Sequence, residues 1–249
     1  MLWPLGYADQ ALQRCQEALT LAQQGDHIPT LTYAAYFVGL VCQCCRDVAA
    51  TQAHADALLA VAAEHRLALR AEQGRLLQGW ALAMQGEMAA GVAHLRQALA
   101  SPDLGPESLR SYWLATLAEA YGRAGQPQAG LQVLAEAVTL LATTAMRWWE
   151  AEVSRLQGEL RLHLPSPDGP QAEACFHQAL QVARRQQAKA LELRAALSIA
   201  RLWQEQGQRA ATHRLLAEIY GWFTEGFDTA DLQEAKALLE ELSRPTGPS

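Results

Sequence analysis

The feature that most constrains this chain is a packing pattern that recurs about every 40 residues. Each copy has a small residue, a larger or apolar residue four positions later, and a small or apolar residue three positions after that. The first members of the six copies are Ala11, Ala50, Gly91, Gly130, Ala172 and Thr212, which lie 39 to 42 residues apart. A fixed period of this length is typical of solenoids, because one repeat buries its apolar face only by stacking on its neighbours.

A second amphipathic segment precedes each triplet, and the residues of both segments favour helix. Ala, Leu, Gln, Glu and Arg dominate, and the alternation expected of strands does not occur. Residues 114–121 and Gly125 resemble the tetratricopeptide pattern, with Gly79 and Gly158 at the small position of other copies. We therefore expect an all-α, tetratricopeptide-like superhelical solenoid of antiparallel helix pairs. HEAT-type repeats of similar length are the alternative.

The pattern predicts a single solenoid over residues 1–249. A partial repeat at 1–24 contains one helix, at 7–24, and a capping helix covers 229–243. Five helix pairs lie between them over 29–222. Their predicted bounds are 29–46 with 50–65, 68–85 with 87–100, 107–124 with 127–142, 147–163 with 169–185, and 188–206 with 208–222.

Charge and cysteine usage exclude several classes of protein. The net charge is −6 and the longest Lys/Arg run is Arg184–Arg185, so we expect no nucleic-acid partner. The most apolar stretch, residues 31–45, is shorter than the roughly 20 residues that span a membrane. We expect no membrane insertion. Five cysteines without an export segment predict reduced thiols and a cytoplasmic protein.

No catalytic motif is present. The chain has no Gly-rich phosphate loop ending in Lys-Ser/Thr, no His-Glu-x-x-His and no Gly-x-Ser-x-Gly, so we expect neither an enzyme nor a cofactor. Cys42, Cys44 and Cys45 would point to different faces of one helix, which favours core packing over a metal site. Trp148 and Trp149 open a predicted first helix, where inter-repeat packing and anchoring of a partner are both open.

The first helices of such a solenoid line its concave surface, where ligands usually bind. Counting from the small position of each first helix places one set of side chains inward. The candidate partner-binding groove consists of Trp80, Tyr112, Glu119, Glu152, Arg155, Glu159, Arg194 and Arg201. A groove of mixed charge suits a peptide or a polar ligand better than nucleic acid, and we expect a protein or peptide partner. The alternative is a ladder of ordinary salt bridges between helices.

The C-terminal half resembles a known protein family. The runs that carry the resemblance are RWWEAE at 147–152, AEACFHQAL at 172–180, RRQQAK at 184–189, LELRAA at 191–196 and LAEIYGWFTEGFDTADL at 216–232. They are similar to the C-terminal tetratricopeptide region of bacterial proteins that join an adenylate/guanylate cyclase domain to a STAND-type ATPase. The resemblance implies a sensor or scaffold tail of a signalling ATPase, and it transfers no catalytic residue.

Two expectations follow for function. The chain is a protein-interaction and regulatory module or, alternatively, a small-ligand sensor of a STAND-type regulator. The segment Leu2–Leu5 looks like the last turn of a first helix whose beginning is missing, so the chain is either a fragment or a short gene product. An unfinished repeat leaves an apolar end uncovered, and we expect self-association there.

Overall fold

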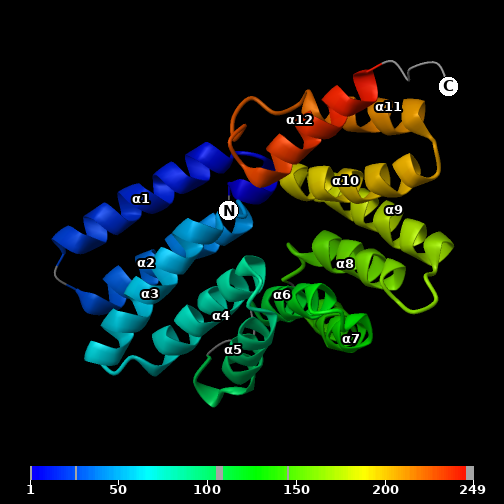
Figure 1. Cartoon of the computed structure of the whole chain (residues 1–249). Helices are drawn as coiled ribbons and strands as arrows, with labels where there is room; N and C mark the ends of the chain where they lie inside the picture. Colours follow the sequence, from blue (N-terminus) through cyan, green and yellow to red (C-terminus); the bar gives the residue numbers. More distant parts are fainter. Residues whose placement is uncertain (1, 26, 105–108, 145, 245–249) are drawn as a thin grey trace. The chain divides into compact units, whose positions relative to one another are not determined.

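The computed structural model describes residues 2–25, 27–104, 109–144 and 146–244. Over these residues it contains twelve α-helices, two short 3₁₀-helices and no strand (Figure 1). The contacts between Cα atoms form two compact units. We call Asp9–Trp149 the N-terminal unit, and Met1–Ala8 with Glu150–Ser249 the C-terminal unit.

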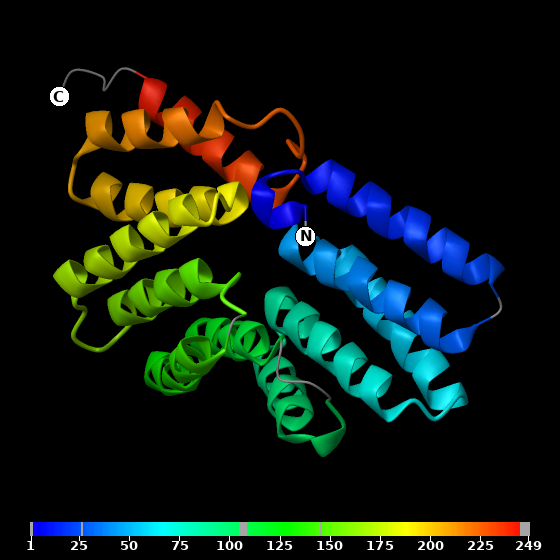
Figure 2. The same cartoon turned by 180° about the vertical axis from the view of Figure 1, so that it is seen from behind.

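From α2 to α7 the N-terminal unit is a succession of antiparallel helices, each packed against the next (Figure 2). The helix α1 meets α2 through Leu19, which clusters with Val38 and Cys42. The helices α2, α4 and α6 occupy the first place of each pair, and α2 contacts α4 as α4 contacts α6. The bounds are α1 Ala8–Gln24, α2 Ile28–Cys44, α3 Val48–Glu64, α4 Ala68–Gln85, α5 Met88–Ala100, η2 Pro102–Leu104, α6 Arg110–Arg123 and α7 Pro127–Thr143.

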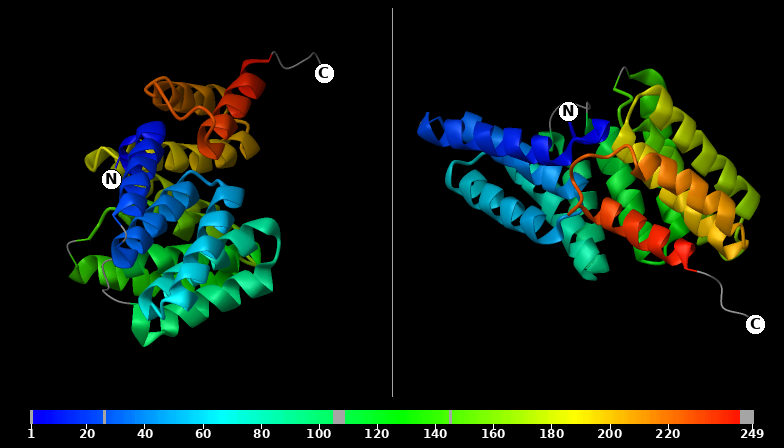
Figure 3. Two further views of the ribbon diagram at one scale, coloured as in Figure 1. Left: turned by 90° about the vertical axis from the view of Figure 1, so that its left-hand side faces the viewer. Right: turned by 90° about the horizontal axis from the view of Figure 1, so that it is seen from above.

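The C-terminal unit repeats this arrangement and adds a segment from the start of the chain. Its first helices α8, α10 and α12 are neighbours, and α9 and α11 pair with α8 and α10. The 3₁₀-helix η1 lies against α10 (Figure 3). The bounds are η1 Trp3–Leu5, α8 Glu150–Leu162, α9 Gly169–Arg185, α10 Lys189–Glu205, α11 Arg209–Tyr220 and α12 Ala230–Ser243.

Local residues explain where several helices begin and end. The Asp47 carboxylate accepts a hydrogen bond from the Ala50 amide at 2.9 Å, and Asp168 caps α9 in the same way. Pro127 occupies the first turn of α7, where no amide donor is needed. Gly86 ends α4 with φ of 100°, a conformation that glycine adopts without strain.

The small residues of the repeat let paired helices approach closely. A Cβ atom added to Gly91 on α5 would lie 2.6 Å from the Gly79 carbonyl oxygen on α4. A Cβ added to Gly158 on α8 would lie 2.4 Å from the Phe176 ring on α9. Ala137 and Ala179 of the predicted triplets are also fully buried. The all-helical stack of packed neighbours is thus confirmed, whereas the tetratricopeptide assignment stays a prediction.

The predicted packing positions are wrong in two copies. In the first copy the predicted third member, Ala18, is exposed, and Leu19 next to it is buried. The prediction placed Ala50, His54 and Ala57 in the packing positions of α3. The structure buries Thr51, Ala55 and Leu58 instead, each one residue later, and leaves Ala57 exposed. The error arose because α3 is rich in alanine, so two adjacent registers match the pattern almost equally well.

The predicted helix bounds agree with the structure to within three residues where both are described. The predicted start at 107 lies outside the described residues. Trp148 and Trp149 precede α8 and do not open it. The single continuous solenoid over 1–249 stays a prediction. Within the described residues, no helix combines the length and the apolar character needed to cross a membrane.

The expectation of an uncovered apolar end is wrong for Trp3, whereas Leu5 is 39% exposed. Residues 3–5 do form a helical turn, but Trp3 is only 3% exposed and Pro4 is buried with it. The turn packs on the C-terminal unit, to which it belongs by its contacts. Self-association through this end stays a prediction.

Candidate functional site

Five of the eight predicted groove residues meet in the C-terminal unit. They lie on α8 and α10 and join two acidic residues of α12 in one set of ion pairs. We call this set the α8–α10–α12 ion-pair network; its members are Glu152, Arg155, Glu159, Arg194, Ser198, Arg201, Asp231 and Glu234. The spacing of three or four residues along each helix puts the members on one face, where they reach the neighbouring helix.

Arg194 is the buried end of the network. Its Nε donates to Asp231 Oδ2 at 2.8 Å, and its Nη1 lies 3.5 Å from Glu152 Oε1. Arg194, Asp231 and Glu152 are 7%, 5% and 4% exposed. Burial acts to lower the pKa of Arg194, but the carboxylates of Asp231 and Glu152 outweigh it, and the pKa is raised. The guanidinium therefore remains charged at any working pH.

Arg155 and Ser198 connect α8 to α10 in the middle of the network. The Arg155 guanidinium bridges two carboxylates of its own helix, Glu152 at 2.7 Å and Glu159 at 3.1 Å. The Ser198 hydroxyl donates to Glu159 Oε1 at 2.6 Å and accepts from Arg155 Nη1 at 3.3 Å. These bonds satisfy groups that would otherwise be costly to bury.

Arg201 is the exposed end of the network. Its side chain is 44% exposed, lies 3.5 Å from Glu159 and forms an ion pair with Glu234 on α12. Exposed pairs of this kind contribute little to stability, because water screens them. This end is the part of the network that is accessible from solvent.

The network fits the salt-bridge alternative more closely than it fits a vacant binding groove. Three guanidinium groups face four carboxylates, so most of the charge is compensated within the protein. The buried members fasten three successive first helices to one another. Because Arg194 is one of these buried members, we expect its replacement to destabilise the fold.

The other three predicted residues belong to the N-terminal unit and are placed differently. Trp80 and Tyr112 are 3% and 1% exposed, so both side chains lie in the core. Glu119 is half-buried and lies 3.8 Å from Arg123 on its own helix. A role of these residues in contacting a partner stays a prediction.

Tyr112 is the centre of an aromatic cluster. Its ring stacks on Trp148 with centroids 5.3 Å apart and meets Trp149 edge-on at 4.7 Å. Trp113 next to it donates from Nε1 to the Tyr36 hydroxyl at 3.2 Å. Trp149 is 5% exposed. For Trp148 and Trp149, inter-repeat packing and anchoring of a partner were both open, and this geometry is that of packing.

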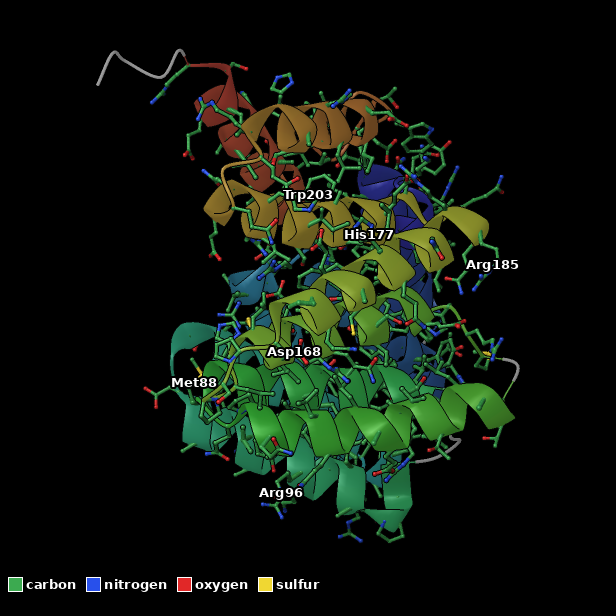
Figure 4. All side chains as sticks on the ribbon, turned by 90° about the vertical axis from the view of Figure 1, so that its right-hand side faces the viewer. Met88, Arg96, Asp168, His177, Arg185 and Trp203 are labelled. Atoms are coloured by element: carbon green, nitrogen blue, oxygen red, sulfur yellow. The ribbon has the colours of Figure 1, made fainter. Side chains whose placement is uncertain are left out.

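An open recess lies over α6 in the N-terminal unit. We call it the α6 recess; its volume is about 510 Å³, and its lining is Ala93, Arg96, Gln97, Leu99, Ala100, Arg110, Leu114, Leu117, Val133 and Glu136. The buried floor is apolar, with Leu114 and Leu117 from α6. Arg110 forms the rim, held by Glu136 at 3.1 Å and by the Leu99 carbonyl oxygen at 3.0 Å. Arg96 on α5 projects outward from the unit (Figure 4).

Sequence reasoning missed the α6 recess and both acidic residues of α12. Asp231 and Glu234 continue the spacing of the first helices, so extending the count into the last helix would have found them. The recess carried no such signal, because its lining comes from three helices and reads as ordinary amphipathic sequence.

The cysteines do not form a recognisable site. Cys42, Cys44 and Cys45 are buried, and burial together with Asp47 raises the pKa of the Cys42 thiol to about 11. Among the described residues, no group of three or more His, Cys, Asp or Glu side chains is placed to hold a metal ion. The expectation of a metal-free protein stays a prediction.

The fold and surfaces define an all-α protein of stacked helix pairs with a charged packing face in one unit and an open recess in the other. No protein-family model matches the chain, and no curated protein matches it.

Proposed function

We propose that this chain is a protein-interaction module of a regulatory system and that it binds a segment of a partner protein. The α6 recess carries the proposal. Its apolar floor offers a surface for a partner's aliphatic side chains, and its charged rim offers Arg110 and Glu136 for polar contacts. Apolar centres with polar rims are the usual composition of protein interfaces.

The shape of the α6 recess favours a peptide or helix over a small molecule. Small-molecule sites enclose most of the ligand surface, whereas this recess is open to solvent between α5 and α7. Amphipathic helices commonly dock into open grooves of this kind with side chains spaced by three or four residues. The alternative, a small-ligand sensor of a STAND-type regulator, would need an enclosed cavity of similar volume.

We further propose a place for the module in a signalling system. The resemblance of residues 147–232 to the tail of cyclase–STAND ATPase proteins supports a role as sensor or scaffold of such an ATPase. The same proposal makes the chain a cytoplasmic binding protein without catalytic activity and without nucleic-acid partners. An ATPase or cyclase reading frame adjoining the gene is the expected finding, and unrelated neighbours would remove the support for this role.

Site-specific photo-crosslinking tests the α6 recess. A photoreactive residue replaces Gln97, which lines the recess and is exposed, or Gln23 on α1, an exposed control position. We expect one partner to crosslink from Gln97 and not from Gln23. Equal crosslinking from both positions would show that the recess is not the binding site.

A pair of charge reversals sharpens the test once a partner is purified. Arg96→Glu changes the rim of the α6 recess, while Arg14→Glu changes an arginine whose side chain is 71% exposed on α1. We expect Arg96→Glu to weaken binding by about tenfold, since a reversed charge on the rim would face a like charge of the partner and repel it. Arg14→Glu should leave the affinity unchanged. Equal effects of the two would indicate a nonspecific dependence on net charge.

A further inference from the structure

The segment Leu2–Tyr7 is built like a bound peptide. Backbone hydrogen bonds within the segment shape it into a turn: the Gly6 amide donates to the Trp3 carbonyl oxygen at 2.9 Å, and the Leu5 and Tyr7 amides donate to that of Leu2 at 3.1 and 3.3 Å. The Trp3 side chain holds the turn to the C-terminal unit and is only 3% exposed.

The residues that receive Trp3 come from α10, α12 and the chain between α11 and α12. We call them the Trp3 seat; they are Ala190, Leu193, Arg194, Phe223, Asp231 and Leu232. The Arg194 guanidinium lies 4.8 Å from the centroid of the Trp3 ring, a distance at which cations attract aromatic faces. A gap of only about 20 Å³, room for about one water molecule, remains beside the ring.

Contacts other than those with Trp3 also hold the residues of the seat. Asp231 and Glu152 hold the Arg194 guanidinium in place from the side of the ion-pair network. Leu193, Phe223 and Leu232 belong to the hydrophobic core that α10, α11 and α12 build among themselves. A site preorganised in this way accepts a ligand at a lower cost in entropy.

Gly6 shows how closely the turn is fitted. It has φ of 96°, and a Cβ atom added to it would lie 2.5 Å from Trp222 Cζ3 and 3.2 Å from Phe223 Cε1. Any other residue at this position would be strained and would collide with the unit. The fit therefore selects a turn with an aromatic residue, a proline and a glycine two positions after the proline.

We propose that the Trp3 seat is a recognition site for a Trp-Pro-x-Gly turn of a partner protein, and that the chain's own residues 3–6 occupy it in this structure. Along the chain, residues 9–149 separate this segment from the rest of the C-terminal unit. The segment can therefore leave the seat without breaking the chain of helices α8 to α12. A partner segment of the same chemistry competes with it for the seat. This site is distinct from the α6 recess, and neither proposal depends on the other.

The test titrates a fluorescein-labelled peptide with the sequence of residues 1–8 into the full-length chain. We expect the Trp3→Ala chain to bind it, and the wild-type chain to bind it at least about tenfold more weakly because its own segment competes at high effective concentration. A peptide with Trp3→Ala should not bind. No binding by a Trp3→Ala chain with wild-type circular dichroism would overturn the proposal, as would equal binding of the two peptides.

Further variants keep the test decisive. If removal of Trp3 unfolds the unit, the Gly6→Ala chain replaces the Trp3→Ala chain in the test. This chain retains Trp3, but its turn is displaced from the seat, so it should also bind the wild-type peptide. In either chain, Trp222→Ala should weaken peptide binding by about tenfold, since Trp222 contacts Gly6 and Tyr7. Phe227→Ala, an exposed aromatic of the same unit outside the seat, should have no effect. Dimers of the wild-type chain that Trp3→Ala abolishes would assign the seat to a second copy and overturn the partner peptide.

Discussion

Equivalent positions of the repeat hold opposite chemistry in the two units. Six residues before the small position, the first helices carry Tyr112 in the N-terminal unit and Glu152 and Arg194 in the C-terminal unit. Tyr112 packs between tryptophan rings, whereas Glu152 and Arg194 form ion pairs. All three side chains are less than a tenth exposed.

This difference shows that the repeat fixes where side chains meet but not how they hold the helices together. Aromatic packing stabilises by burying apolar surface and tolerates small shifts of the rings. A buried ion pair gains little net stability over a well-packed apolar pair. Removing one partner nevertheless destabilises the fold strongly, because the other charge stays buried without compensation. We therefore expect the two units to respond differently to substitution, to pH and to salt.

The largest expected effect is that of Arg194→Ala. The substitution removes the cation that Asp231 and Glu152 share in the buried part of the C-terminal unit. Breaking a buried pair in this way costs about 3–5 kcal/mol. Urea denaturation followed by circular dichroism measures the loss. A loss below about 1 kcal/mol would mean that this unit does not depend on its buried ions.

Overpacking should affect both units alike. Ala137→Leu in the N-terminal unit and Ala179→Leu in the C-terminal unit each insert a large side chain at a fully buried position. We expect each to cost about 1–3 kcal/mol of unfolding free energy. Ala57→Leu, at an exposed position of α3, is the matched control and should be tolerated. Unchanged melting temperatures for the two buried variants would contradict the observed packing.

Alkaline pH should weaken the N-terminal unit through its buried neutral groups. Burial raises the pKa of the Cys42 thiol from its ordinary value near 9 to about 11, so the folded state binds this proton more tightly than the unfolded chain. The corresponding stability is fully present below pH 9 and is lost as the pH rises through 11. Denaturation at several pH values should show a smaller loss for Cys42→Ala than for the wild type. Identical pH profiles would exclude Cys42 as the cause.

The smallest expected effect is that of Arg201→Ala at the exposed end of the ion-pair network. The side chain is 44% exposed, so its pairs with Glu159 and Glu234 should contribute only about 0.2–1 kcal/mol. Added salt should reduce that difference further. A loss as large as that of Arg194→Ala would show that the network acts as one cooperative unit from end to end.

The helices were predictable because their signal is local and repeated. The spacing of apolar residues and the glycines between segments place the helices to within three residues of the observed bounds. The error in the register of α3 arose where the local signal is degenerate, since alanine suits both the packed and the exposed position. The inward count, which predicted a partner-binding groove, also selected five residues that the structure brings together in the ion-pair network.

The surfaces were less predictable because they depend on contacts between distant segments. The α6 recess combines residues of α5, α6 and α7, and the depth of such a recess is set by how the helices are spaced. The burial of Trp3 depends on residues nearly 200 positions away. No pattern within the first eight residues predicts which distant residues would pack on Trp3.

The seating of Trp3 against Arg194 also bears on the order in which the protein is made. The ribosome synthesises the Leu-Trp-Pro-Leu segment long before it reaches α10. At translation rates of about 5–20 residues per second, the segment waits on the order of 10–40 s for its site. Residues 9–149 can fold as they emerge. The C-terminal unit is complete only when α10 and α12 have been synthesised and pack on Trp3. A chaperone that holds short apolar segments would find it accessible throughout that interval.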